Sequence, residues 1–164
     1  MFIFIHLILG LLIGLSFKSA LTITVIAILS HFLLDYIPHW DGWFDKEYFE
    51  RNGHAKINWR DIYVVSIDIA ASIICMFVFW HFTFLNHISY NKTNVAMGAF
   101  MSILPDIVKL GYFTRLKNNE KYLNYLTYHA KIQKAPDEVD WKLGIVTQII
   151  LLMILIASIA YIMF

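Results

Sequence analysis

The length of the uncharged apolar runs limits the possible folds of this chain more than any other feature. Leu143–Phe164 contains no charged side chain, and Ile69–Leu85 is interrupted only by His81 and hydroxyl side chains. An apolar stretch of about 18 residues or more is typical of a helix that spans a lipid bilayer. Charged residues make up 15% of the chain, whereas about 25% is usual in soluble domains. The sequence therefore predicts an integral membrane protein.

Five apolar segments follow one another along the chain, and we expect each to form a membrane-spanning helix. They are residues 2–17, 20–37, 62–85, 93–113 and 143–164. The first has neither the basic region nor the small-residue cleavage site of a signal peptide, so we expect it to be retained. The predicted fold class is all-α, a polytopic bundle of about five transmembrane helices that forms a single domain over residues 1–164.

The distribution of Lys and Arg predicts the orientation of this bundle. Of the 13 basic residues, all but Lys18 and Lys92 lie in or beside two polar connections, residues 38–61 and 114–141. The positive-inside rule makes both connections cytoplasmic, with a cytoplasmic N-terminus. The net charge of the chain is +1, which is not the strongly basic charge typical of nucleic-acid-binding proteins. We therefore expect membrane lipid as a partner and no nucleic acid.

Several ionisable side chains lie inside the predicted spans, where they are costly. A charge at the centre of a membrane helix costs about 2.5–3.5 kcal/mol on insertion scales. Asp35, Asp68 and Asp106 are embedded in the second, third and fourth segments. On the predicted topology they lie at a similar depth to His6 and Gln148, near the cytoplasmic side. Embedded ionisable residues indicate a functional site, so we expect the helices to bring these groups together.

Small residues repeat on the same helix faces as the polar groups. Gly10 and Gly14 follow His6 at steps of four residues, and Gly98 precedes Asp106 by two such steps. A stripe of small residues lets two helices approach closely. We therefore expect these stripes, and the polar groups on them, to face the interior of the bundle.

The stretch SHFLLDYIPHWD holds the densest set of candidate metal ligands. His31 and Asp35 are four positions apart and share one helix face. Pro38 is expected to end the helix because proline lacks a backbone N–H. His39 and Asp41 then lie just beyond the helix end, at the membrane interface.

Imidazole and carboxylate groups without thiolates suit a divalent metal, with zinc expected and Mn or Mg as alternatives. The chain has a single cysteine, so a thiolate site is excluded. The expected metal ligands are His6, His31, Asp35, His39 and Asp106. The expected catalytic groups, as a general base or a side chain that closes over the metal, are Asp68, His129 and Asp41. Each of these side chains also has a structural interpretation, as a packing histidine, a hydrogen-bonded pair or an interfacial residue.

The segments HLILGLLIG, SHFLLDYIPHWD and SILPDI resemble the membrane-bound metal-dependent hydrolases of bacteria, a group of LexA-regulated inner-membrane proteins. His31 and Asp35 followed by Pro38 are more distantly similar to the zinc signature of the phospholipase C and nuclease P1 superfamily. The resemblance implies a metal-dependent hydrolase in a bacterial inner membrane. The chain departs from the group after Asp106, where the Asp-His pair is absent, and it lacks the HRGxTHS segment.

Three functions are open at this point. The first is a metal-dependent hydrolase, with a phosphoester or lipid-like substrate. The second is a metal-ion or proton transporter, whose site would be expected near the bilayer midplane, whereas these polar groups lie to one side. The third is a non-catalytic membrane adaptor held together by polar groups. Interhelical hydrogen bonds average about 0.6 kcal/mol, which offsets little of the cost of three embedded acids, so we favour the hydrolase.

Overall fold

A computed structural model describes residues 1–40, 51, 59–109, 111, 119–132 and 140–163, and this part of the chain is all-α, as predicted. Its helices are α1 (Ile3–Ser16), α2 (Ala20–Tyr36), α4 (Trp59–Leu85), α5 (Lys92–Lys109), α6 (Glu120–Ile132) and α7 (Trp141–Met163). No strand occurs in the described ranges.

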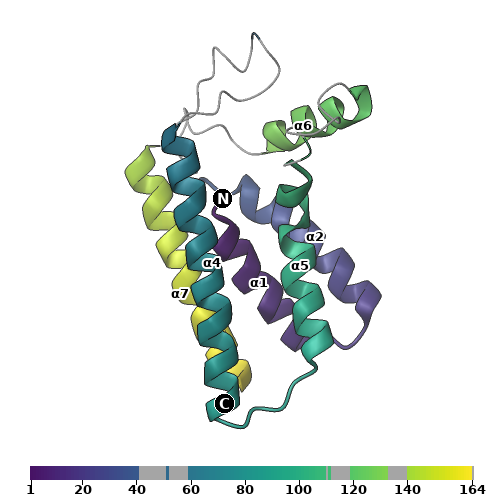
Figure 1. Cartoon of the computed structure of the whole chain (residues 1–164), viewed down its shortest axis with the longest axis vertical. Coiled ribbons are helices and arrows are strands. Elements are labelled where there is room, and N and C mark those ends of the chain that lie inside the picture. Colours follow the sequence, from purple (N-terminus) through teal and green to yellow (C-terminus); the bar gives the residue numbers. More distant parts are fainter. Residues whose placement is uncertain (41–50, 52–58, 110, 112–118, 133–139, 164) are drawn as a thin grey trace.

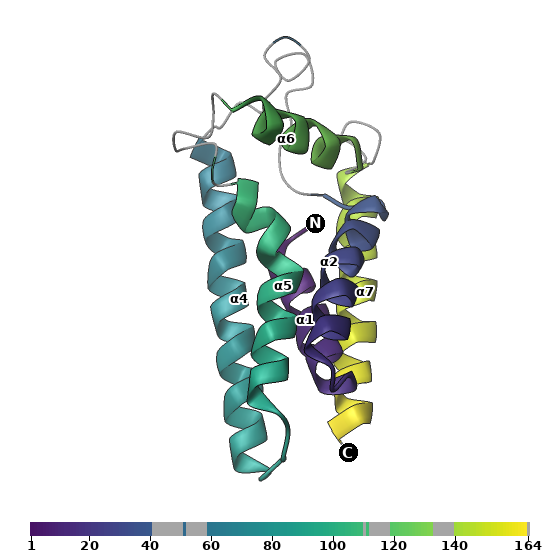
Figure 2. The same cartoon turned by 90° about the vertical axis from the view of Figure 1, so that its right-hand side faces the viewer.

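Helix α1 is the centre of the bundle and contacts α2, α4, α5 and α7. It lies between the α4–α7 pair on one side and the α2–α5 pair on the other (Figure 1). Helix α6 crosses one end of the bundle, close to the N-terminus, and the C-terminus lies at the opposite end (Figure 2). We call these the α6 end and the distal end.

Glycines bring the backbones of α1 and α5 into direct contact. A Cβ atom added at Gly98 would lie 2.2 Å from the carbonyl oxygen of Gly10, and one added at Gly14 would lie 2.5 Å from the Cα of Val95. Real Cβ atoms do not approach that closely, so only glycine fits at these positions. The predicted small-residue stripes are confirmed, and they fix how closely the two helices pack.

The outward faces of α4 and α7 are apolar and exposed. Ile62–Leu85 and Trp141–Met163 are each long and apolar enough to cross a membrane, and only 17% of the most apolar part of each is buried in the bundle. Large side chains such as Ile73, Phe77 and Ile154 point outward with more than half of their surface accessible. Exposed apolar surface of this extent marks an interaction site with a membrane or a protein.

In the described part of the chain, two helices rather than about five meet the length and composition expected of a span. Helix α1 has 14 residues and α2 has 17, fewer than the roughly 20 that a bilayer requires. The apolar runs overstate these helices because the chain leaves the helix at Phe17 and again at Ile37, which is extended before Pro38. In α5, polar side chains at both ends lower the hydropathy of an 18-residue helix.

Candidate metal centre

Four side chains from three helices converge at the α6 end of the bundle. His31 and Asp35 come from α2, Asp106 from α5 and His129 from α6, and one ligand atom from each lies within 4.8 Å of all the others. His31 and Asp35 are fully buried, His129 is 1% exposed and Asp106 is 10% exposed. We call this group the four-residue cluster.

The His31 ring is held by a backbone carbonyl, as in many metal-binding histidines. Its Nδ1 lies 2.8 Å from the carbonyl oxygen of Ser102, which can only accept, so Nδ1 carries the proton. In the neutral ring Nε2 then has a free lone pair. That nitrogen lies 3.3 Å from Asp35 Oδ2 and 3.2 Å from His129 Nε2. A metal ligand oriented through its other ring nitrogen has this arrangement.

The two oxygens of Asp35 have different surroundings. Oδ1 accepts a hydrogen bond from the amine of Met1 at 2.9 Å and lies 3.1 Å from His6 Nε2. Oδ2 is buried with no hydrogen-bond partner and lies 3.7 Å from His129 Nε2. Ligand atoms about 2.0–2.2 Å from a tetrahedral zinc lie roughly 3.3–3.6 Å apart. The spacing of the His31, Asp35 and His129 atoms and the unpaired Oδ2 both fit a cation among them, while Asp106 Oδ1 is further off, 3.9 Å from His31 Nε2.

Asp106 and Lys109 form the exposed side of the cluster. Oδ1 of Asp106 pairs with the Lys109 ammonium, which is one turn further along α5 and 32% exposed. Oδ2 of Asp106 is buried with no hydrogen-bond partner. Asp106 is therefore the most exposed member of the four-residue cluster, and Lys109 lies beside it.

Tyrosine hydroxyls fasten α6 to the C-terminal end of α5. Tyr125 donates to the carbonyl of Pro105 at 2.9 Å, and Tyr122 donates to the carbonyls of Val108 and Lys109 at 3.1 and 2.8 Å. The last four carbonyls of a helix lack partners within it, and in α5 the Tyr122 hydroxyl bonds to two of these, those of Val108 and Lys109. Together with the Tyr125 bond, this holds α6 over the α2–α5 pair, where His129 reaches the cluster.

Burial sets the protonation of the α6 side chains. Burial, together with the nearby Lys109 ammonium, lowers the pKa of His129 to about 4, so its ring is neutral at pH 7. Burial and the Asp106 carboxylate raise the pKa of Tyr125 to about 12, so its hydroxyl remains a donor.

The structure brings three of the five predicted metal ligands together, namely His31, Asp35 and Asp106. His6 lies directly behind them, with its ring stacked on His31 at a centroid distance of 4.1 Å. His39 is outside the four-residue cluster. Its Nε2 lies 2.6 Å from the Met1 amine, and its Nδ1 donates to the carbonyl of Ile37.

The predicted catalytic residues are distributed differently. His129 lies within the four-residue cluster itself. Asp68 accepts hydrogen bonds from the backbone N–H groups of Ile3 and Phe4 at 2.6 and 3.0 Å, and thus satisfies the free donors of the first turn of α1. Asp41 lies outside the described residues.

Sequence reasoning missed three contributors to the site: the Ser102 carbonyl, the Lys109 ammonium and the tyrosine hydroxyls of α6. Pro105 is only an indirect signal for the first, because its missing N–H frees the carbonyl of Met101, the neighbour of Ser102. Lys109 is one helical turn beyond Asp106, a spacing that indicates an ion pair. Nothing in the sequence pairs the α6 tyrosines with α5.

Comparisons with protein-family models, with curated proteins and with solved structures give no match to this chain. The resemblance inferred from the three sequence segments therefore stays a prediction.

Proposed function

We propose that this chain is an integral membrane protein that binds one divalent metal ion in the four-residue cluster and uses it for hydrolysis. The observation that carries the proposal is the convergence of two imidazoles and two carboxylates, from three helices, with an unpaired oxygen on each carboxylate. Buried polar groups normally have hydrogen-bond partners. A bound cation is the simplest partner for lone pairs that meet in this way.

The apolar outer faces of α4 and α7 support the membrane part of the proposal. We propose that α4 and α7 cross the bilayer, and that the short central α1 is shielded from lipid by its four neighbours. The α6 end, with most of the basic residues nearby in sequence, would face the cytoplasm of a bacterial inner membrane.

The imidazole nitrogens and carboxylate oxygens of the cluster favour zinc. Mn or Mg would be favoured instead if carboxylates and water made up most of the ligands. A bound metal lowers the pKa of its water towards about 7 and so generates a nucleophile at neutral pH. A catalytic site of this kind has three protein ligands and an open position for water, so with His31, Asp35 and His129 as the ligands, Asp106 would remain to accept the proton of that water. The oxygen of the water would attack the phosphorus or carbonyl carbon of an ester, and the alcohol would leave with a proton.

Lys109 favours an anionic substrate. Its ammonium is the charged group next to Asp106 on the exposed side of the cluster. A phosphoester that approached the metal from this side would meet the ammonium first, and a cation next to developing phosphate charge stabilises the transition state. A phosphoester is therefore the proposed substrate class.

Metal content and hydrolysis, measured on the same samples, test the proposal. We expect the detergent-purified chain to hold about one divalent ion per molecule by elemental analysis. His129→Ala and Asp35→Asn should lose the metal, because one removes a ligand and the other removes the charge of a ligand, and changing even the hydrogen-bond partners of ligands typically costs about 10–100-fold in affinity. His81→Ala is the matched control, since His81 is exposed on α4, stacks on Phe77 and is not part of the four-residue cluster.

Hydrolysis of p-nitrophenyl phosphate by the metal-loaded protein, abolished by chelation, is the expected activity. A chain that binds no metal under several metal supplies would contradict the proposal and favour the adaptor. Metal binding without turnover of any ester tested, together with metal flux into proteoliposomes, would favour the transporter instead.

A further inference from the structure

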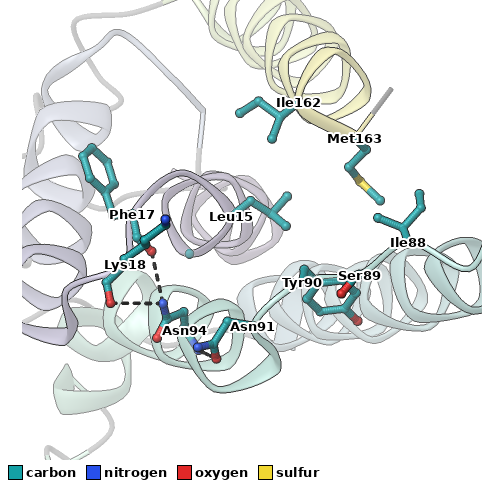
Figure 3. Close-up of a pocket in the computed structure, with 11 residues that line it drawn as sticks. Leu15, Phe17, Lys18, Ile88, Ser89, Tyr90, Asn91, Asn94, Ile162 and Met163 are labelled. Atoms are coloured by element: carbon teal, nitrogen blue, oxygen red, sulfur yellow. Dashed lines mark hydrogen bonds between the residues drawn. The ribbon is translucent and has the colours of Figure 1, made fainter.

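A cavity with a partly polar lining lies at the distal end of the bundle, far from the four-residue cluster. It has a volume of about 710 Å³ and lies where the end of α1, the α4–α5 connection and the end of α7 meet (Figure 3). Its polar lining includes Lys18, Ser89, Tyr90 and Asn91. Gly14, which also lines it, is about 12 Å along the α1 axis from His6.

Asn94 fixes the turn that carries the lysine. Its side-chain amide donates to the carbonyls of Phe17 and Lys18 at 3.1 and 3.3 Å (Figure 3). The side chain is 8% exposed and comes from the first turn of α5. The backbone that carries Lys18 is therefore tied to the first turn of a neighbouring helix.

An apolar groove opens next to this cavity. It has a volume of about 490 Å³, and the helices α4 and α7 form its walls with Phe4, Ile8 and Leu11 of α1 between them. Its lining residues are all apolar, and Met163 of α7 lines both the groove and the polar cavity. The two spaces are thus neighbours, one lined by apolar groups and the other containing a cation.

The groove has the length of one bilayer leaflet. Its walls run from Ala71 to Phe82 on α4 and from Leu152 to Met163 on α7, which is about 16 Å of helix in each case. Half of a hydrocarbon core of about 30 Å is about 15 Å. Both walls lie in the distal halves of their helices, and the groove runs from the depth of Phe4 on α1 to the distal end of the bundle.

We propose that the distal end binds one phospholipid, with an acyl chain in the groove and its phosphate next to Lys18. The inference rests on the membrane placement in the proposed function, and not on the metal. An alkyl chain matches an all-apolar groove of leaflet length, and a lysine at the edge of the hydrocarbon is suited to a lipid phosphate. Because the metal centre lies at the other end of the bundle, this lipid is a resident ligand rather than the substrate.

Retention of phosphatidylglycerol, counted by native mass spectrometry after transfer from nanodiscs to mild detergent, tests this site. Ala160→Trp places a large ring in the groove, whereas Ala157→Trp places the same ring one turn earlier on α7, outside the lining. We expect one lipid per chain in the wild type and in Ala157→Trp, and at least tenfold weaker retention in Ala160→Trp. Equal retention by the two variants would overturn the proposal.

A second pair of variants tests the headgroup contact. Lys18→Gln should weaken retention about fivefold, the effect of one lysine near an anionic headgroup. Lys92→Gln is the control, because Lys92 lies over the ring of Trp80 at 5.1 Å and does not line the polar cavity. The wild type should retain diacylglycerol, which lacks the phosphate, as weakly as the Lys18→Gln variant retains phosphatidylglycerol. Equally strong retention of both lipids would overturn the phosphate contact.

Metal content in the same samples separates this proposal from the proposed function. Ala160→Trp should keep the metal of the wild type, which also shows that the variant is folded. Lipid retention without any metal would contradict the hydrolase and leave the lipid site standing. A chain that does not partition with membranes would contradict both the membrane placement and the lipid site.

Discussion

The two faces of α1 are packed in opposite ways. Towards α5 the backbones touch, because Gly10 and Gly14 meet Gly98 with no room for a Cβ atom. Towards α4 and α7 the large side chains Ile8 and Leu11 line an open groove. One face of α1 is thus packed backbone to backbone against α5, and the other face borders an open groove.

The closely packed face of α1 lies next to the four-residue cluster, whose atoms must be held in fixed positions, whereas the open face does not. His6 lies on the α1 face that meets α5, and its Nε2 lies 3.1 Å from Asp35. A site built on backbone contacts keeps its ligand atoms in place within the small tolerance that catalysis needs. Neither face of α1 contributes a member of the four-residue cluster, but the face towards α5 carries His6, which stacks on His31. The packing of the open face is therefore freer to vary without moving the cluster.

The largest effect is expected from Gly98→Ala on the closely packed face. Its new Cβ atom would lie 2.2 Å from the carbonyl oxygen of Gly10, and helix backbones cannot move aside as a flexible side chain does. Overpacking typically costs about 1–3 kcal/mol. We expect a lower thermal midpoint in detergent together with loss of bound metal. Ala96→Ser, which adds one atom on the exposed side of α5, should leave both unchanged, and the same result for Gly98→Ala would contradict the close α1–α5 contact.

The second effect concerns the polar attachment of α1 to α4. Asp68→Ala removes the acceptor for the N–H groups of Ile3 and Phe4, which should cost about 0.5–2 kcal/mol, as loss of a helix cap does. Metal content should persist, because Asp68 is not among the four ligands. Ser66→Ala is the control, since its hydroxyl bonds only within its own helix. If Asp68→Ala abolished hydrolysis but left stability and metal content intact, the catalytic role predicted from the sequence would be favoured over the structural one.

The sequence predicted which side chains of α2 and α5 meet in the four-residue cluster better than it predicted the contribution of α6. His31 and Asp35 follow from helical spacing, and Asp106 follows from the cost of an acid in an apolar segment. His129 lies in a polar stretch, where no periodicity indicates what it packs against. Its place depends on tyrosine bonds to carbonyls at the end of α5, and the partners in such contacts are set by tertiary structure rather than by residue spacing.

The span count failed for a related physical reason. Hydropathy measures how apolar a run is, but the length of a helix depends on where the chain turns. Phe17 and Ile37 are apolar and yet lie outside their helices, because they are extended at the C-terminal caps. The all-α fold and the shortness of the first segment could be predicted, whereas the central position of α1 could not.

A smaller effect is expected where α6 is attached to α5. Tyr125→Phe removes a hydrogen bond to the Pro105 carbonyl, which is worth about 0.5–1.5 kcal/mol. Because α6 carries His129, part of this loss should appear as metal affinity, a decrease of up to about tenfold by competition titration. Tyr128→Phe removes the same hydroxyl from a side chain that is 62% exposed and should bind metal as the wild type does. Identical affinities for the two variants would show that α6 is held by other contacts.

The smallest effect belongs to the open face of α1. Cys75→Ala trims a thiol that lines the groove between α4 and α7 and is only partly buried. Removing an atom from the wall of an open groove leaves no closed void, so the cavity cost of a core truncation does not arise. We expect a change in unfolding free energy below about 0.5 kcal/mol, with metal content unchanged. A loss comparable to that of Gly98→Ala would mean that this face is as closely packed as the other, and the contrast between the two faces of α1 would then fail.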